Sequence, residues 1–410
     1  MEYKLSNDEQ AELIELTKQL IKIPSSTHDG GKIYEFVKKY LKDRGFKPKF
    51  QSIKNPYLEY TDFSNLCLKL GNGNNNGPKI MLNGHLDTVV PGREWFHSPY
   101  SGFEQNGKIF GIGAADMKGG CAASMIAVGA LMERKETING ELFLSFVFGE
   151  EAPFSLGADT LLREYDLSDY DLIIVTEPSP LLAINDYCYV HKKTHKSKFP
   201  VVIIGAEGRI LFEVEFFGKS THASHPSQGI NALHSAAILI SKLDDFDMFS
   251  SIKMGRGHYC VLGIEGGDEI FTVPSYCKIR VNRQLTLGEN EKSAIAELKK
   301  VIKNLKLKSK VTIKKRFSPN PDLEYRPYLF EKSRFINSFI RMLPQPKNGV
   351  PCRFTSSSIG DFNIFATRTK VPTLVFGPGG GNIHSADEYV NKNEVIDTAN
   401  YILNYFMEIF

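Results

Sequence analysis

Short apolar runs that lead directly to a histidine or an acidic residue constrain the fold of this chain more than any other feature. Each run has the length and composition of a buried strand. The runs and the residues that follow them are 79–83 before His85, 141–148 before Glu150 and Glu151, 171–176 before Glu177, and 373–376, which leads through a glycine loop to His384. In open α/β sheets, ligands bind beyond the carboxyl ends of the strands. The pattern therefore predicts a site at one edge of such a sheet.

Helical periodicity lies between these runs. Apolar residues recur at helical spacing over 9–22, 33–41, 118–134 and 393–407, and the first of these segments stops before Pro24. Strands that alternate with helices indicate an α/β fold. We expect a mostly parallel sheet flanked by helices.

The middle of the chain has a different pattern. Residues 211–217, 276–286 and 309–316 alternate as half-buried strands, and residues 232–243 and 291–305 have helical spacing. This order predicts a small α+β module over 210–317. The module would be inserted into a catalytic domain formed by 1–209 and 318–410.

Composition excludes several classes of protein. The 410 residues carry a formal net charge of +3, which is too weak a bias to predict a nucleic-acid or membrane partner. The first ten residues lack the apolar segment of a signal peptide, and no apolar stretch is long enough to span a membrane. The six cysteines form no CxxC pair. We expect a reduced, cytoplasmic enzyme that acts on a small-molecule substrate.

The residue types that follow the strands suit a metal centre. Imidazoles and carboxylates without a thiolate are typical of a catalytic zinc site, and one bridging carboxylate would allow two ions. Asp116, in a glycine-rich loop before a helix, could alternatively be only an N-cap. Glu150 and Glu151 are adjacent, so one can bind metal while the other faces a water. Asp87, two residues after His85, can orient the imidazole ring.

At these residues the sequence resembles a known family. The shared segments are NGHLDTV (83–89), GIGAADMKGG (111–120), GEEAPFSLGA (149–158), TEPS (176–179), FGPGGG (376–381) and NIHSADE (382–388). They are similar to the two-zinc family of acetylornithine deacetylase, succinyl-diaminopimelate desuccinylase, aminoacylase and glutamate carboxypeptidase. The resemblance extends over nearly the whole chain.

The resemblance implies a role for each residue of the predicted site. The implied ligands of two Zn²⁺ ions, with Co²⁺ or Mn²⁺ as alternatives, are His85 and Glu177 for one ion, Glu151 and His384 for the other, and Asp116 between them. Glu150 would be the general base and then the general acid, and Asp87 would orient His85. A cis peptide bond is implied between Asp116 and Met117.

The inserted module resembles the lid of that family, which is also its dimerisation surface, so the resemblance implies a homodimer. Within GKSTHASHP (218–226) it implicates His222 in stabilising the oxyanion, and within GINA (229–232) it implicates Asn231 in substrate binding. Arg283 alternates in phase with apolar neighbours, so it needs an anion or a route to solvent. The resemblance assigns it the carboxylate of the substrate.

These features predict a hydrolase that cleaves an amide bond next to a free carboxylate, either an N-acyl-amino-acid deacylase or a carboxypeptidase. By the resemblance, Glu177 favours these two over a dipeptidase or aminopeptidase, which more often has Asp at this position. A non-catalytic metal-binding scaffold is a further alternative, but it predicts the loss of Glu150 or of a ligand. Ile112, where the family often has Arg, and the long segment 187–208 leave the subfamily open.

Overall fold

The computed structural model describes residues 2–26, 31–54, 63–71, 76–151, 155–183, 198–243, 249–267, 271–316, 323–344 and 353–410. The chain divides into two compact units, Met1–Ala206 with Leu329–Phe410, and Glu207–Tyr328. The second unit occupies the part of the sequence where the inserted module is predicted. Most of the predicted long segment 187–208, up to residue 197, lies outside the described residues.

A nine-stranded mixed sheet forms the centre of the first unit, with strand order β1-β2-β6-β3-β7-β17-β8-β15 and β16 paired to β8. The strands are β1 (Lys49–Ser52), β2 (Ser64–Gly71), β3 (Lys79–His85), β6 (Glu141–Val147), β7 (Leu172–Val175), β8 (Val202–Ala206), β15 (Tyr328–Leu329), β16 (Arg353–Ser356) and β17 (Thr373–Val375). The neighbours β6, β3, β7 and β17 run parallel, whereas β1 and β2 are antiparallel additions at one side. The predicted parallel arrangement therefore holds for the central strands, which lead to the predicted site.

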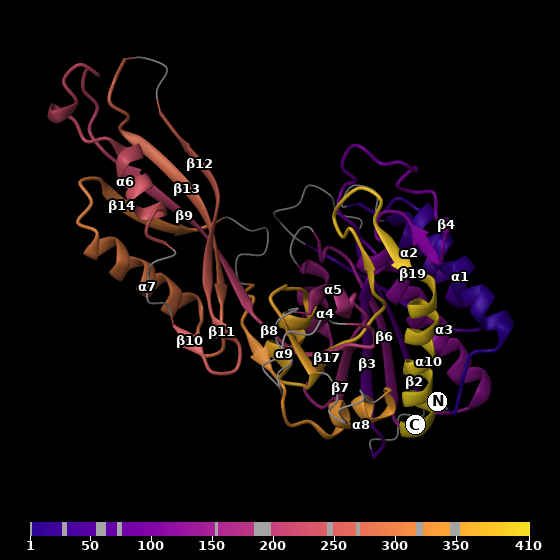
Figure 1. Ribbon diagram of the computed structural model, residues 1–410. Helices are drawn as coiled ribbons and strands as arrows, with labels where there is room; N and C mark the ends of the chain where they lie inside the picture. The colour runs from indigo at the N-terminus through magenta and orange to yellow at the C-terminus, as the bar shows by residue number, and fades with distance from the viewer. Residues whose placement is uncertain are drawn as a thin grey trace. The chain divides into compact units, whose positions relative to one another are not determined.

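Helices cover both faces of this sheet (Figure 1). The helices are α1 (Asn7–Lys22), α2 (Gly31–Asp43), α3 (Gly119–Arg134), α4 (Leu156–Glu164), α5 (Ser179–Leu182), α8 (Arg334–Met342), α9 (Asp361–Thr369) and α10 (Lys392–Ile409). Helices α1, α3 and α10 pack against one another, and α4 packs against α9. Figure 1 shows these two groups on opposite sides of the sheet. Because both faces are covered, β3 is buried along almost its whole length.

A second, small sheet of the first unit was not predicted, since its strands are only two or three residues long. Its order is β18-β19-β5-β4, formed by β4 (Phe103–Gln105), β5 (Lys108–Phe110), β18 (Gly380–Gly381) and β19 (Tyr389–Asn391). Strand β5 precedes the loop that carries Asp116, and β18 and β19 flank the loop that carries His384. The small sheet thus joins two loops that are far apart in the sequence.

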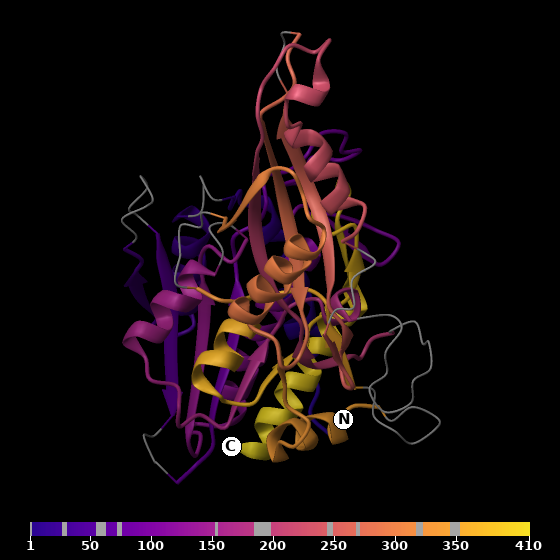
Figure 2. The ribbon, with the colours of Figure 1, turned by 90° about the vertical axis from the view of Figure 1, so that its left-hand side faces the viewer.

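The second unit is a four-stranded antiparallel sheet with order β12-β13-β9-β14, on which α6 and α7 pack (Figure 2). Its elements are β9 (Gly208–Phe217), η2 (Pro226–Gln228), α6 (Ala232–Ile240), β10 (Ser250–Ser251), β11 (Gly255–Arg256), β12 (His258–Gly266), β13 (Tyr276–Leu285), α7 (Glu291–Asn304) and β14 (Lys310–Lys315). Alternate residues of β9 are buried, as the sequence pattern predicts. Strand β12 was missed because a bulge between Val261 and Gly263 interrupts its alternation.

Two observations bear on the membrane and on the cysteines. In the described part of the chain, no helix is long and apolar enough to cross a membrane. Cys67, Cys121, Cys260 and Cys277 are free thiols. The other two cysteines lie outside the described residues.

Candidate metal centre

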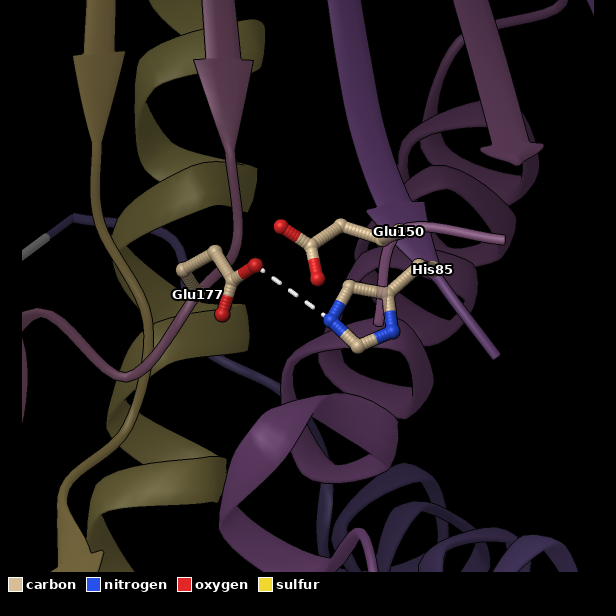
Figure 3. Close-up of side chains that lie close together, drawn as sticks. All are labelled: His85, Glu150 and Glu177. Carbon is tan, nitrogen blue, oxygen red and sulfur yellow. Dashed lines mark ion pairs between the residues drawn. The ribbon is translucent and has the colours of Figure 1, made fainter. Parts of the chain in front are cut away.

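The central parallel strands place the predicted residues at one edge of the sheet. His85 is the last residue of β3, Glu150 and Glu151 follow β6, and Glu177 follows β7. Since β6, β3 and β7 are parallel neighbours, their carboxyl ends lie together. Figure 3 shows His85, Glu150 and Glu177 directed toward one another beyond these strand ends.

Asp116 lies at the centre of the cluster. Its Oδ1 is 3.2 Å from Nε2 of His85, and its Oδ2 is 3.4 Å from Nε2 of His384. The side chain makes no cap for α3, whose N-cap is Lys118, so the alternative of a simple capping residue is excluded. The peptide bond between Asp116 and Met117 is cis, as the resemblance implies.

Each imidazole also faces a second carboxylate. Nε2 of His85 is 3.3 Å from Oε1 of Glu177, the pair marked in Figure 3, and Nε2 of His384 is 2.8 Å from Oε1 of Glu151. The side chains thus form two groups, each with one imidazole and one glutamate, which share the carboxylate of Asp116. This is the arrangement that two ions with one bridging ligand require.

Asp87 contacts His85 through its main chain rather than through its carboxylate, which differs from our expectation. Nδ1 of His85 is 3.0 Å from the main-chain oxygen of Asp87, whereas its distance to the carboxylate Oδ1 is 3.7 Å. Oδ2 of Asp87 instead accepts a hydrogen bond of 3.1 Å from the backbone N–H of Glu151. A proton on Nδ1, donated to the carbonyl, leaves the Nε2 lone pair of His85 facing Asp116 and Glu177. Asp87 therefore orients the ring through its backbone and fixes Glu151 through its side chain.

The electrostatics of the cluster favour bound cations. Burial raises the pKa of Glu150 well above its ordinary value and raises the pKa of Glu177 to about 8. Hydrogen bonds to Asp116 and Glu151 raise the pKa of His384 to about 10. Among the described residues, the ion pairs of Asp116, Glu151 and Glu177 go to imidazoles alone. Buried carboxylates that pair with imidazoles alone form the kind of environment that divalent cations neutralise.

The donor atoms also fit zinc. Ligand atoms of His85, Glu150 and Glu177 lie within 4.8 Å of one another, as do those of His85, Asp116 and Glu151. Imidazole nitrogen and carboxylate oxygen suit zinc and tolerate cobalt or manganese. Cys121 is buried beside the centre, but its thiol donates to the carbonyl oxygen of His85.

Gly360 and Asp361 lie beside Glu150 and were not predicted from the sequence. A Cβ atom added to Gly360 would lie 2.9 Å from Oε1 of Glu150, so the carboxylate rests against this glycine. Asp361, the first residue of α9, is fully buried next to it, and burial raises its pKa to about 7. No local sequence signal distinguishes these residues from the start of an ordinary helix.

Two further buried ionisable side chains support the loop of Asp116. The carboxylate of Glu388 accepts hydrogen bonds from the backbone of Gly113, Ala115 and Asp116. Nζ of Lys118 donates to the carbonyl oxygen of Ile23 at 3.0 Å, and burial lowers its pKa to about 7. Glu388 stands in the segment 382–388 that carries the resemblance, but the sequence assigns it no role.

His222 and Asn231 belong to the second unit, whereas all the metal-ligand candidates belong to the first. His222 is exposed, with Nδ1 2.7 Å from Oγ of Ser224. The side-chain oxygen of Asn231 accepts from the backbone of His234 at 3.2 Å and caps α6. Their predicted roles toward a substrate remain predictions.

Arg283 has two acidic partners within the second unit. Its guanidinium is fully buried, with Nη2 2.5 Å from Oε1 of Glu289 and 3.1 Å from Oε2 of Glu297. The sequence argument that Arg283 needs an anion is right, but these two glutamates provide it. Gly257 makes room for the side chain, because a Cβ there would lie 1.9 Å from Nη1. The assignment of Arg283 to the carboxylate of a substrate therefore stays a prediction.

The fold and the candidate metal centre of this chain are typical of metal-dependent hydrolases. The profile of peptidase family M20/M25/M40 matches residues 81–408. The chain belongs to this family, which agrees with the resemblance seen in its motifs.

Two curated relatives match the chain over almost its full length. The succinyl-diaminopimelate desuccinylase of a Nitratiruptor species is 26% identical over 389 residues, which cover 94% of this chain and 96% of that protein. The acetylornithine deacetylase of Buchnera aphidicola subsp. Acyrthosiphon pisum (strain Tuc7) is 25% identical over 410 residues, which cover 95% and 96%.

Solved structures share the fold. The aminopeptidase PepT from Bacillus cereus ATCC 10987 has a TM-score of 0.73 at 19% identity, with 98% of each chain covered. The Bacillus subtilis YXEP protein, described as a dinuclear metal binding peptidase from the M20 family, has a TM-score of 0.69 at 13% identity, with 98% of this chain and 99% of that chain covered. At these identities the likeness extends to the fold alone.

Proposed function

We propose that this chain is a two-metal amidohydrolase that removes the acyl group from an N-acylated amino acid with a free carboxylate. The desuccinylase and deacetylase relatives support a deacylase rather than a carboxypeptidase or a dipeptidase. The observation that carries the proposal is the carboxylate of Asp116, which directs one oxygen toward His85 and the other toward His384.

In this proposal each ion has an imidazole and a glutamate of its own. His85 and Glu177 would hold one Zn²⁺, Glu151 and His384 would hold the other, and Asp116 would be shared. Co²⁺ or Mn²⁺ could replace zinc at such donors. When bound, the ions would polarise the scissile carbonyl and lower the pKa of a water molecule.

Glu150 would carry out the proton transfers. Its carboxylate lies within the cluster and is assigned to no ion, so it is free to take a proton from the attacking water and deliver it to the leaving nitrogen. His222 is proposed to donate a hydrogen bond to the developing oxyanion, and Asn231 to contact the substrate. The second unit would act as a lid and as the surface of a homodimer, in a reduced cytoplasmic enzyme.

The test is hydrolysis of N-succinyl and N-acetyl amino acids alongside dipeptides, with metal-stripped protein before and after addition of Zn²⁺ or Co²⁺. We expect turnover of the acylated amino acids to depend on metal. The variant Glu150→Gln should lose about 10²–10⁴-fold in kcat, because the isosteric amide cannot accept the proton. It should still bind two ions per chain, since Glu150 is not a proposed ligand.

Three outcomes would contradict the proposal in different ways. Faster turnover of dipeptides with a free amino group would identify a peptidase. Equal turnover by Glu150→Gln and the wild type would remove Glu150 from the mechanism. Two bound ions without hydrolysis of any of these amides would support the non-catalytic scaffold.

A further inference from the structure

Glu388 makes an unusual set of contacts for a residue outside the predicted ligand set. Its side chain is 1% exposed, and its two carboxylate oxygens accept three backbone hydrogen bonds. The donors are the N–H groups of Gly113 at 3.1 Å, Ala115 at 2.9 Å and Asp116 at 3.1 Å. All three donors lie in the loop that presents the shared carboxylate.

The local backbone explains why the loop needs an acceptor at this place. Gly113 has the left-handed φ of 75°, and Asp116 and Met117 depart from helical φ and ψ, so helical hydrogen bonds do not satisfy these N–H groups. Successive N–H groups around a left-handed residue form a concavity that binds anions. The carboxylate of Glu388 fills this concavity.

The same residue connects the two halves of the centre. The main-chain oxygen of Glu388 accepts a further hydrogen bond, of 2.9 Å, from the backbone of Gly111. Glu388 follows His384 by four positions and precedes β19, which pairs with β5 on the other side of the Asp116 loop. Glu388 therefore fixes the loop of Asp116 against the segment that carries His384.

We propose that Glu388 is a positioning residue of the metal centre, which holds the carboxylate of Asp116 at the place where both imidazoles can share it. This inference rests on the two-metal centre proposed above. It predicts that the two acceptor oxygens and the length of the Glu388 side chain determine metal affinity, and not merely the stability of the fold.

The test is a titration of the metal-stripped full chain with Co²⁺. Calorimetry would measure the affinity, and the visible absorption of bound cobalt would report on the coordination. Glu388→Gln keeps the shape of the side chain but replaces one acceptor oxygen by an amide that must face an N–H donor. We expect the affinity for at least one Co²⁺ to fall by about 10–100-fold. The absorption spectrum should also change, because the displaced Asp116 alters the coordination.

Glu394→Gln is the matched control. Glu394 also anchors backbone, since its Oε2 accepts from the N–H of Gly379 at 2.8 Å, but that loop carries no proposed ligand. We expect this variant to bind two Co²⁺ with wild-type affinity. Circular dichroism of each variant would establish that it is folded. If Glu388→Gln does not fold, Glu388→Asp, which keeps both acceptor oxygens but is one methylene shorter, would replace it.

The possible results separate the role of Glu388 from the proposed function. Wild-type Co²⁺ affinity in a folded Glu388 variant would overturn the positioning role. So would an equal loss of affinity in Glu394→Gln, because it would reduce Glu388 to one of several anchors of the fold. A wild-type chain that binds fewer than two Co²⁺ would contradict the two-metal centre itself, and the positioning role with it.

Discussion

At the scale of single residues, the absence of a side chain is as important as the ligands. The carboxylate of Glu150 rests against Gly360, whose φ of −173° and ψ of −165° are extended and accessible to other residues. The backbone therefore does not require glycine at this position. The requirement is space, because a Cβ would lie 2.9 Å from Oε1 of Glu150 and 2.8 Å from Cε1 of Phe362.

We predict that Gly360→Ala lowers kcat and leaves metal binding intact. The methyl group would displace the carboxylate of Glu150 from the proton that it must accept, and a misplacement of about 1 Å can cost about 100-fold in rate. Steady-state kinetics with an acylated amino acid would measure kcat, and a Co²⁺ titration would count the ions. Because the added methyl group meets Glu150 and Phe362 rather than a proposed ligand, KM and stoichiometry should change little.

Gly129→Ala is a suitable control for this substitution. A Cβ at this position in α3 would meet no atom within 4 Å, so activity should be unchanged. Stability should rise by about 0.5–1 kcal/mol, since alanine is the better helix former. A wild-type kcat in Gly360→Ala would show that Glu150 does not need the space beside Gly360.

The predicted ligands and the supporting residues differ in what a sequence can reveal. His85, Glu150 and Glu177 could be identified because each follows a recognisable apolar strand, and parallel strands bring their ends together. Glu388 could not, because its partner Gly113 is 275 residues away and the contact depends on tertiary structure. Gly360 could not be identified either, because its role is to leave space for the carboxylate of Glu150.

At the scale of elements, β13 has two arginines on opposite faces of one sheet. Arg283 points to the buried face and pairs with Glu289 and Glu297, whereas Arg280 is 38% exposed and pairs with Glu265. The period of a strand predicted the buried position of Arg283 correctly. It could not reveal the partners, because Glu289 follows the strand and Glu297 lies on α7.

We predict that Arg283→Ala destabilises the second unit by about 3–5 kcal/mol, because it leaves two glutamates without their buried cation. Arg280→Ala should cost no more than about 1 kcal/mol, as expected for an exposed ion pair. Hydrogen exchange of β9 and β13, followed by mass spectrometry, would report on this unit. Trp95 is the single tryptophan and lies in the first unit, so its fluorescence would serve as the internal control.

The same comparison tests whether Arg283 binds a substrate or stabilises the fold of the second unit. If Arg283 bound the carboxylate of the substrate, Arg283→Ala would raise KM while exchange in β13 stayed at the wild-type rate. Loss of protection in β13 together with unchanged tryptophan fluorescence would instead support the buried ion pairs.

At the scale of the whole molecule, the two edges of the sheet in the second unit differ in how well they could pair with another chain. Strand β14 carries Lys310, Lys314 and Lys315, and lysines on an edge strand oppose pairing with another chain. Strand β12, at the other edge, instead exposes Leu262 and Ile264, each 52% accessible. A homodimer through this unit should therefore form at the edge of β12.

We predict that the chain sediments as a dimer and that Ile264→Lys makes it a monomer, because the substitution places a charge at the proposed edge. Ile252→Lys is the matched control, since Ile252 is 98% exposed but lies in the turn between β10 and β11 rather than on the edge strand. It should remain dimeric. A monomeric wild type would contradict the homodimer.

Kinetics of the Ile264→Lys monomer would distinguish two arrangements of the oxyanion donor. Retained kcat would mean that His222 serves its own subunit. A large loss of kcat without a change in metal content would mean that His222 acts on the metal centre of the other subunit.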